Sequence, residues 1–136
     1  MDRLRTFLET LQDSFLSGKL EAMLASFSLP TVIYSVVGVT VLRDKVDFLH
    51  TAQKYHAALI AKAVVASSVE IIERDHASKN RSRVTVRIVD MDSRGNKVTT
   101  SLIRYFLVHT KNSYRIEMME YLEAPLSSNE IERIIH

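Results

Sequence analysis

The sequence predicts an α+β domain in which N-terminal helices pack on a curved antiparallel sheet of four to six strands. Apolar residues recur at helical spacing in much of the first 62 residues, and from residue 64 the apolar period changes to two. Four long segments of this second kind follow one another, joined by short turn sequences. The length of 136 residues fits one core, so residues 1–136 are predicted to form a single domain.

Two helices are predicted at the N-terminus. The first covers residues 3–16, because its apolar side chains fall three or four positions apart, at Leu4, Phe7, Leu8, Leu11 and Phe15. Asp2 is placed to cap its first amides, and Gly18 suits the left-handed conformation that ends a helix. A shorter helix is expected at 19–27, and Pro30 should stop it.

Two short strands and a long helix come next. Residues 31–37 are β-branched and aromatic, Gly38 interrupts them, and residues 39–42 continue as a second strand. Asp44 and Asp47 mark a helix start, because carboxylates favour the positive end of the helix dipole. The helix is predicted at 45–62, with a buried stripe formed by Val46, Leu49, Ala52, His56, Leu59, Ile60 and Ala63.

The second half of the chain is predicted to be an antiparallel meander. The expected strands cover residues 65–77, 82–92, 97–109 and 114–123. The turn Asp92-Ser93-Arg94-Gly95 has the aspartate and the glycine that a type I turn with a glycine bulge prefers. A last helix is expected at 128–135, because Ser127 and Glu130 have the spacing of a capping box.

The strand at 97–109 is apolar on both faces. One face carries Val98, Leu102, Phe106 and Val108, and the other carries Ile103, Tyr105 and Leu107. A sheet with one wet face would alternate apolar and polar residues. One face should therefore meet the helices, and the other is predicted to meet the same face of a second copy in a homodimer.

Composition excludes several classes of protein. The chain has no cysteine, so neither a disulfide framework nor thiolate chemistry is expected, and no run approaches the roughly 18 apolar residues of a membrane span. Both observations favour a cytoplasmic protein. No glycine-rich phosphate loop and no zinc spacing occurs, so no cofactor and no metal is expected.

Basic residues are concentrated in one hairpin. Residues 79–104 hold seven of the 18 basic side chains, although the net charge is only +2. Such a hairpin could attract phosphates or an acidic partner. The simpler interpretation is a solvated face whose arginines pair with Glu70, Glu73 and Asp75 on the preceding strand. Aromatic residues are not interleaved with these arginines, so nucleic-acid binding is not expected.

The segment FLSGKLEAMLASFSLPTVIYSVVG, residues 15–38, resembles the nuclear transport factor 2-like superfamily, which includes ketosteroid isomerase, scytalone dehydratase and the SnoaL-like polyketide cyclases. The order of elements over residues 1–123 is also similar to that superfamily. The resemblance implies a cystatin-like cone that takes ligands at its open end. It also places Ser35 where the isomerase-like enzymes carry a general-base aspartate, and serine alone cannot abstract a proton from carbon.

Six residues are candidates for the pocket. Arg104 is expected on the inward face, where an arginine needs an anionic partner, which would be either a ligand or Glu117 on the next strand. Tyr34 and Tyr121 could donate hydrogen bonds into the cone, or could be satisfied locally. His56 could face the pocket or be a core histidine, and Ser35 completes the set. No catalytic residue is assigned.

Three hypotheses for function follow. The first is a dimeric binding or regulatory module whose cone holds a small apolar or anionic ligand. The second is an enzyme of the isomerase, dehydratase or cyclase kind that uses His56, Tyr34 or Tyr121 in place of the missing aspartate. The third is an interaction partner that acts through the basic hairpin. The first is preferred, because the fold pattern is complete while the base position holds a serine.

Overall fold

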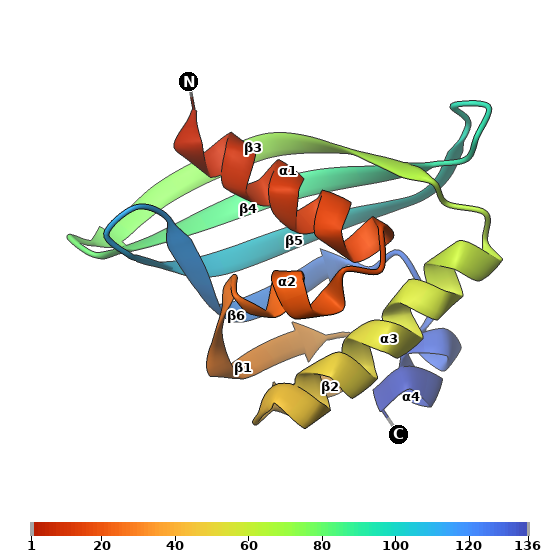
Figure 1. Ribbon diagram of the computed structural model, residues 1–136, viewed down its shortest axis with the longest axis horizontal. Coiled ribbons are helices and arrows are strands. Elements are labelled where there is room, and N and C mark those ends of the chain that lie inside the picture. The colour runs from red at the N-terminus through yellow and green to blue at the C-terminus, as the bar shows by residue number, and fades with distance from the viewer. Residues whose placement is uncertain (1, 136) are drawn as a thin grey trace.

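The structure is a computed structural model that describes residues 2–135. Its elements follow in the order α1 (Arg3–Leu16), α2 (Leu20–Leu24), β1 (Phe27–Ser35), β2 (Gly38–Leu42), α3 (Lys45–Ala61), β3 (Ala66–Ser78), β4 (Arg81–Met91), β5 (Lys97–His109), β6 (Tyr114–Glu123) and α4 (Ser128–Ile135). Helices α1, α2 and α3 lie on one side of a curved sheet (Figure 1). The predicted α+β class is confirmed.

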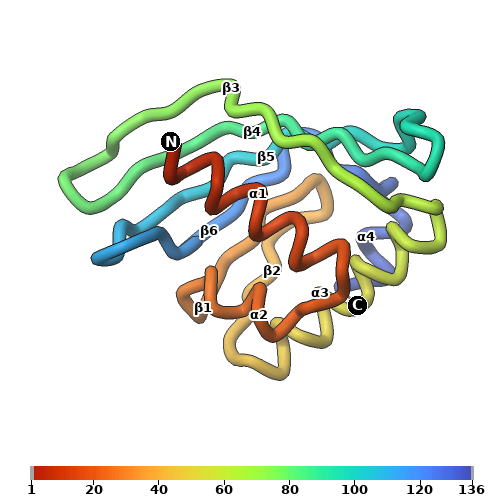
Figure 2. Tube along the Cα trace, turned by 45° about the horizontal axis from the view of Figure 1, so that its top comes forward, coloured from red at the N-terminus to blue at the C-terminus, as the bar shows by residue number. Residues whose placement is uncertain are grey.

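The six strands form one sheet in the order β2-β1-β6-β5-β4-β3. Strands β3 to β6 are neighbours in sequence and in space, so the predicted meander is confirmed. Strand β1 lies parallel to β6, and every other pair is antiparallel. Figure 2 shows the long strands curling over α1, which leaves a concave side for the helices.

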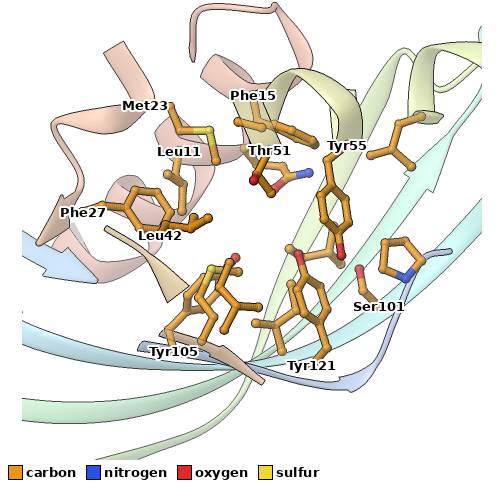
Figure 3. A pocket seen from close by; sticks show the side chains of 18 of the residues that line it. Leu11, Phe15, Met23, Phe27, Leu42, Thr51, Tyr55, Ser101, Tyr105 and Tyr121 are labelled. Carbon is orange, nitrogen blue, oxygen red and sulfur yellow. The ribbon is translucent and has the colours of Figure 1, made fainter. Parts of the chain in front are cut away.

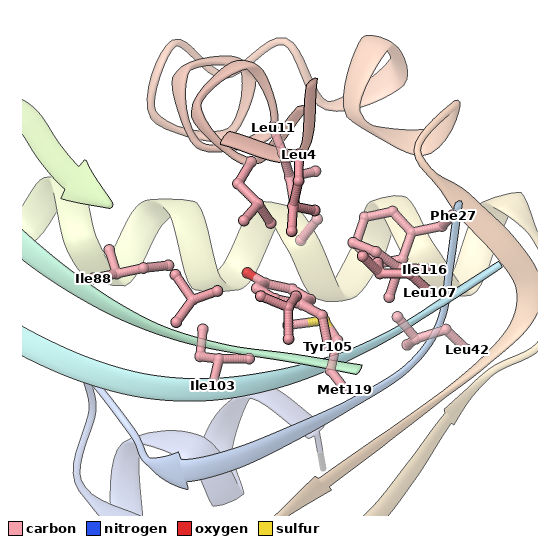
Figure 4. Packing of buried hydrophobic residues seen from close by; sticks show 14 of the residues in the cluster. Leu4, Leu11, Phe27, Leu42, Ile88, Ile103, Tyr105, Leu107, Ile116 and Met119 are labelled. Atoms are coloured by element: carbon pink, nitrogen blue, oxygen red, sulfur yellow. The ribbon is translucent and has the colours of Figure 1, made fainter. Parts of the chain in front are cut away.

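The main core fills that concave side. Leu4, Leu8 and Leu11 project from α1, and each is at most 4% exposed. They meet the inner residues of β4 and β5, together with Phe27, Phe48 and Ile116 (Figure 4). Burying one such side chain contributes about 1.5–3 kcal/mol to folding, so this contact fixes the position of α1 on the sheet.

The inner face of β5 consists of its odd-numbered residues. Ile103, Tyr105 and Leu107 are at most 3% exposed and pack towards the helices. Arg104 alternates with them and therefore lies on the outer face. The prediction that Arg104 faces inwards is wrong, because both faces of this strand are apolar and alternation alone does not reveal which one meets the helices.

Two further expectations need correction in the first half of the chain. Helix α2 ends at Leu24 rather than near residue 27, and β1 begins at Phe27, so Pro30 lies within a strand instead of stopping a helix. The buried stripe of α3 consists of Phe48, Ala52, Tyr55 and Leu59. Val46 is 74% exposed and Ile60 is 48% exposed, so the predicted stripe was rotated around the helix axis.

Helix α4 packs against α3 and builds a second, smaller core. Leu126, Ile131 and Ile134 are buried against Tyr55 and Leu59 of α3. Ser127 and Glu130 form the predicted capping box, with distances of 3.0 and 3.2 Å between each side-chain oxygen and the opposite backbone nitrogen. Phe15 of α1 packs against both cores. Within residues 2–135, no helix is long and apolar enough to cross a membrane.

Candidate ligand cavity

A cavity of about 90 Å³ lies between the helices and the inner face of the sheet. Helices α1 and α3 form one wall, and strands β4, β5 and β6 form the opposite wall. Most of the lining is apolar, and it includes six aromatic rings, those of Phe15, Phe27, Phe48, Tyr55, Tyr105 and Tyr121 (Figure 3). The few polar groups in the lining therefore determine its chemistry.

Asp90 is the acidic residue of this cavity. It lies near the end of β4, continues the inward series of Val84, Val86 and Ile88, and is 1% exposed. One carboxylate oxygen accepts a hydrogen bond from the hydroxyl of Ser67 at 2.5 Å, and the other accepts one from the hydroxyl of Thr99 at 2.6 Å. Such short distances are typical of hydroxyl groups that donate to an ionised carboxylate.

Three tyrosines surround the cavity and have unsatisfied hydroxyl groups. Tyr55 comes from α3, Tyr105 from β5 and Tyr121 from β6. Within residues 2–135, none of the three hydroxyls forms a hydrogen bond, and no buried side-chain oxygen is sealed off without a partner. The hydroxyls are therefore open to the cavity, where a ligand or water can reach them.

Burial keeps these phenols protonated. Burial raises the pKa of Tyr55 to about 12. Burial also raises the pKa of Tyr105, and the negative charge of Asp90 adds to that effect. The pKa of Tyr121 is raised well above its usual value by burial, then by Tyr55, Tyr105 and Asp90. All three hydroxyls are therefore hydrogen-bond donors at neutral pH.

Tyr55 and Tyr121 face each other across the cavity. Tyr55 extends from α3 and Tyr121 extends from β6, and both hydroxyl groups point into the cavity (Figure 3). Their rings are parallel to within 4°, and the ring centroids are 6.2 Å apart. The ring of Tyr121 packs against the main core and the ring of Tyr55 belongs to the smaller core, so the positions of the two hydroxyls are fixed before any ligand binds.

Among the residues that the structure describes, no lysine, arginine or histidine lines the cavity. Gln12 is the polar residue that α1 contributes, and its amide donates to the Ser67 hydroxyl at 3.2 Å. A chain of side-chain hydrogen bonds thus connects Gln12 through Ser67 to Asp90. Among residues 2–135, no group of three or more His, Cys, Asp or Glu side chains is arranged to hold a metal ion.

Of the six residues predicted for the pocket, Tyr121 lines the cavity. His56 lies beside α1, where a ring nitrogen is 3.1 Å from the carbonyl oxygen of Leu16, and it does not line the cavity. Ser35 ends β1, and its hydroxyl oxygen is 3.4 Å from the amide nitrogen of Val37. Ser35 does not line the cavity either.

The other three predicted residues lie outside the cone. Tyr34 is 42% exposed on the outer face of β1. Arg104 pairs on the outer face with Glu120, at 2.9 Å, and not with Glu117 as predicted. Glu117 instead accepts two hydrogen bonds from Arg81, at 2.8 and 3.2 Å. A bulge between Phe106 and Leu107 shifts the register of β5 against β6 and brings Glu120 opposite Arg104.

Sequence reasoning missed Asp90, Tyr105 and Tyr55. The sequence does contain a signal for Asp90, because this acid ends the alternating series Ser82, Val84, Val86 and Ile88. Tyr105 would have followed from choosing the odd-numbered face of β5. Tyr55 stands seven positions after Phe48, at the spacing of one helical face, but the predicted stripe was one position out of phase.

Comparisons with known proteins agree with this architecture. The model of a protein family described as NTF2-like protein (DUF6841) matches residues 2–123. A solved Nostoc punctiforme domain of unknown function with a cystatin-like fold superposes with a TM-score of 0.69 at 16% identity, covering 96% of this chain and 80% of that one. No curated protein matches the sequence significantly.

Two further solved structures are similar. An NTF2-like protein from Novosphingobium aromaticivorans has a TM-score of 0.63 at 14% identity, covering 98% of this chain and 87% of that chain. A ketosteroid isomerase-like protein from Erwinia carotovora has a TM-score of 0.57 at 12% identity, covering 90% and 95% respectively. At these identities the similarities concern the fold alone.

Proposed function

This chain belongs to the family of NTF2-like proteins (DUF6841), which its residues 2–123 match, and we propose that its cone binds one small, largely apolar molecule. The observation that carries the proposal is an apolar cavity with three unpaired phenol hydroxyls and one buried carboxylate in its wall. Protein interiors rarely leave polar groups unpaired, and a bound molecule would satisfy them.

The size of the cavity limits the ligand. At about 90 Å³ it is smaller than the engineered cavity of about 150 Å³ that holds benzene. It is also well below the roughly 300–1,000 Å³ of sites for drug-sized ligands. Scaled by volume from the six carbon atoms of benzene, the cavity holds about four non-hydrogen atoms, so compact molecules of about four or five such atoms fit most closely. A fused ring system would require the helices to move.

The charges in the wall argue against a negatively charged ligand inside the cone. Asp90 would repel it, and no described residue of the lining supplies a cation to offset that repulsion. The anionic ligand expected from the sequence depended on Arg104, which lies on the outer face. The proposal is therefore narrowed to a ligand without negative charge.

The test uses tert-butanol, a neutral molecule of suitable size, and one cavity-filling variant. We expect tert-butanol to shift the NMR signals of the methyl groups of Met23, Ile103 and Met119, which line the cavity. Ala52→Leu fills the space from α3 and should abolish these shifts. Ala57→Leu, at an exposed position of the same helix, is the matched control and should bind like the wild type. Equal shifts in both variants would show that the probe binds elsewhere.

A second candidate function is catalysis of proton transfer, which Asp90 favours. A carboxylate that has only hydroxyl partners and is shielded from water can act as a general base. The hydroxyls of Tyr55 and Tyr121 could hold a carbonyl oxygen and stabilise the negative charge that develops on it. Asp90 would thereby supply the base that is absent at Ser35.

Exchange of carbon-bound hydrogen tests this second function. In heavy water, the wild-type protein should accelerate the exchange of the protons next to the carbonyl group of acetone above the buffer rate. Asp90→Asn should return exchange to the buffer rate, because the amide is not a base. Wild-type exchange at the buffer rate would count against this chemistry for simple ketones.

We further propose that the protein acts as a homodimer through the outer face of the sheet. Val32, Tyr34, Val39, Val41, Leu102, Phe106 and Met118 share this face and are exposed or half-buried. The charged residues nearby already pair within the chain, as Arg104 does with Glu120 and Arg83 with Asp75. A second copy presents the same apolar surface, which satisfies the symmetry of a twofold interface.

A further inference from the structure

We propose that the cone selects a positively charged ligand, a small organic ammonium ion that pairs with the carboxylate of Asp90 and is enclosed by aromatic rings. This inference rests on the proposed binding function and adds the charge of the ligand. It starts from an imbalance in the wall of the cavity, to which residues 2–135 contribute one buried anion and no cation.

Asp90 has no positively charged partner within the described part of the chain. All seven ion pairs of residues 2–135 involve other acids, and no Lys, Arg or His nitrogen lies within ion-pair distance of Asp90. The hydroxyls of Ser67 and Thr99 supply one hydrogen bond to each carboxylate oxygen, which leaves the negative charge in place. A buried charge destabilises the protein unless it is paired. A cationic ligand would therefore be attracted by the carboxylate of Asp90, which no cationic side chain of residues 2–135 pairs with.

The aromatic lining favours the same charge. Six rings surround a space of about 90 Å³, and three of them carry hydroxyl oxygens that can accept a hydrogen bond from N–H. The face of an aromatic ring attracts a cation by about 0.5–2 kcal/mol, with the larger values where water is excluded. A cage of rings closed by one carboxylate is suited to an alkylammonium group.

The charge of Asp90 acts across the cavity. Burial is the main cause of the raised pKa of Tyr105, and Asp90 adds to it. The same carboxylate contributes to the raised pKa of Tyr121, after burial and the two other tyrosines. A group that opposes the ionisation of two phenols also stabilises a cation placed between them.

A metal ion fits this site poorly. Calcium takes about six to eight oxygen ligands, and magnesium requires octahedral coordination. The wall of the cavity provides one carboxylate, a few hydroxyls and many ring carbons. An organic cation needs fewer oxygen atoms and uses the apolar surface, so it is the cation that the lining accommodates.

Three probes with the same number of non-hydrogen atoms separate charge from size. They are tert-butylammonium, tert-butanol and propionate, which at pH 7 are cationic, neutral and anionic. Dissociation constants are measured from the methyl shifts of Met23, Ile103 and Met119. We expect the ammonium ion to bind at least about tenfold more tightly than the alcohol, and propionate to bind more weakly than both.

Two variants test the origin of that preference. Asp90→Asn keeps the shape and removes the charge, so the ratio of the two dissociation constants should fall to within about threefold of unity. Phe15→Leu removes one ring and should reduce the ratio by a smaller factor, about twofold to fivefold. Glu70→Gln removes an exposed acid from the outer face and is the matched control, with the ratio of the wild type.

The outcomes distinguish this inference from the proposed function. Equal binding of the ammonium ion and the alcohol, or a preference for propionate, overturns the inference and leaves a neutral binding site. No binding of any probe overturns both. If Asp90→Asn does not fold, Phe15→Leu decides, because a merely structural role of Phe15 would weaken the ammonium ion and the alcohol equally.

Discussion

At the scale of single residues, the cavity depends on tyrosines whose rings are buried and whose hydroxyls are free. The ring of Tyr55 belongs to the core below α4, while its hydroxyl opens to the cavity. Burial raises its pKa to about 12, from about 10 for an exposed phenol. The neutral form is therefore favoured in the folded protein more strongly than in the unfolded chain.

This difference predicts a loss of stability in alkaline solution. Below pH 10 the phenol of Tyr55 is neutral in both states, and its contribution to the free energy of unfolding is fully present. Between pH 10 and about 12 the unfolded chain releases the proton and the folded protein keeps it, so stability falls as the pH rises through this window. The slope from one such group is at most about 1.4 kcal/mol per pH unit.

Urea unfolding at several pH values from 9 to 12 measures this slope. Tyr55→Phe should lose less stability over the window than the wild type does, because one of the shifted groups is gone. Ile60→Ala, at a 48% exposed position of α3, removes no phenol and serves as the comparison. Identical slopes for the wild type and Tyr55→Phe would contradict the assignment.

At the scale of elements, the sequence predicts periodic segments well and their orientation poorly. The bounds of α1, β5, β6 and α4 agree with prediction, because each has a clear apolar period between strong turn or capping signals. The start of β1 was missed, since a Leu-rich run followed by Pro30 has the pattern of a helix end. Local preference there is overridden by pairing with β6, where Ser26 accepts a hydrogen bond from Ile116 at 2.8 Å.

The prediction of the site depended on which face of strand β5 and which face of helix α3 was taken to point inwards. Strand β5 is apolar on both faces, and only its contacts with α1 and α3 distinguish Tyr105 from Arg104. In α3, Val46 and Ile60 are apolar but exposed. Because the predicted buried stripe included both residues, it did not include Tyr55. Of the two tyrosines expected to donate into the cone, Tyr121 lines the cavity, whereas Tyr34 lies on the outer face.

The C-terminal helix offers a prediction at this scale. Ile131 is 1% exposed in the core that α4 builds on Tyr55 and Leu59. Ile131→Ala should lower the free energy of unfolding by about 2–5 kcal/mol, since it removes buried carbon and leaves a void. Ile60→Ala, at a 48% exposed position of α3, makes the same chemical change without the void and should cost less than about 1 kcal/mol.

Chemical unfolding of both variants at pH 7 measures the difference. A loss below 1 kcal/mol for Ile131→Ala would mean that α4 contributes little to the fold. In that case α4 would not hold Tyr55 in place, and the cavity would owe its shape to α1, α3 and the sheet.

At the scale of the whole molecule, the two faces of the sheet have different chemistry. The inner face carries the core, Asp90 and the phenols. The outer face carries apolar residues on β2, β1, β6 and β5, together with the ion pair of Arg104 and Glu120 on β5 and β6 and that of Arg83 and Asp75 on β4 and β3. Single exposed apolar residues are normal, but we propose that this apolar patch across four neighbouring strands is the dimer interface.

Met118 lies at the centre of that patch, opposite Val32 on β1 and Phe106 on β5. Met118→Lys places a charge where the second copy is proposed to pack, and two such charges would face each other across a twofold axis. We expect wild-type protein to sediment as a dimer at micromolar concentration and Met118→Lys to sediment as a monomer. Val46→Lys introduces the same charge at a 74% exposed position of α3 and should remain dimeric.

Dimerisation should also connect the two faces, because strand β6 carries Met118 outwards and Met119 and Tyr121 inwards. If dimer contacts on the outer face fix the curvature of the sheet, the Met118→Lys monomer should bind tert-butanol more weakly than the Val46→Lys dimer does. A monomeric wild-type protein would remove the dimer from the proposal, and the cavity would then be a property of the single chain. Equal binding by the two variants would show that the curvature of the sheet is set within one protomer, by the core between α1 and β5.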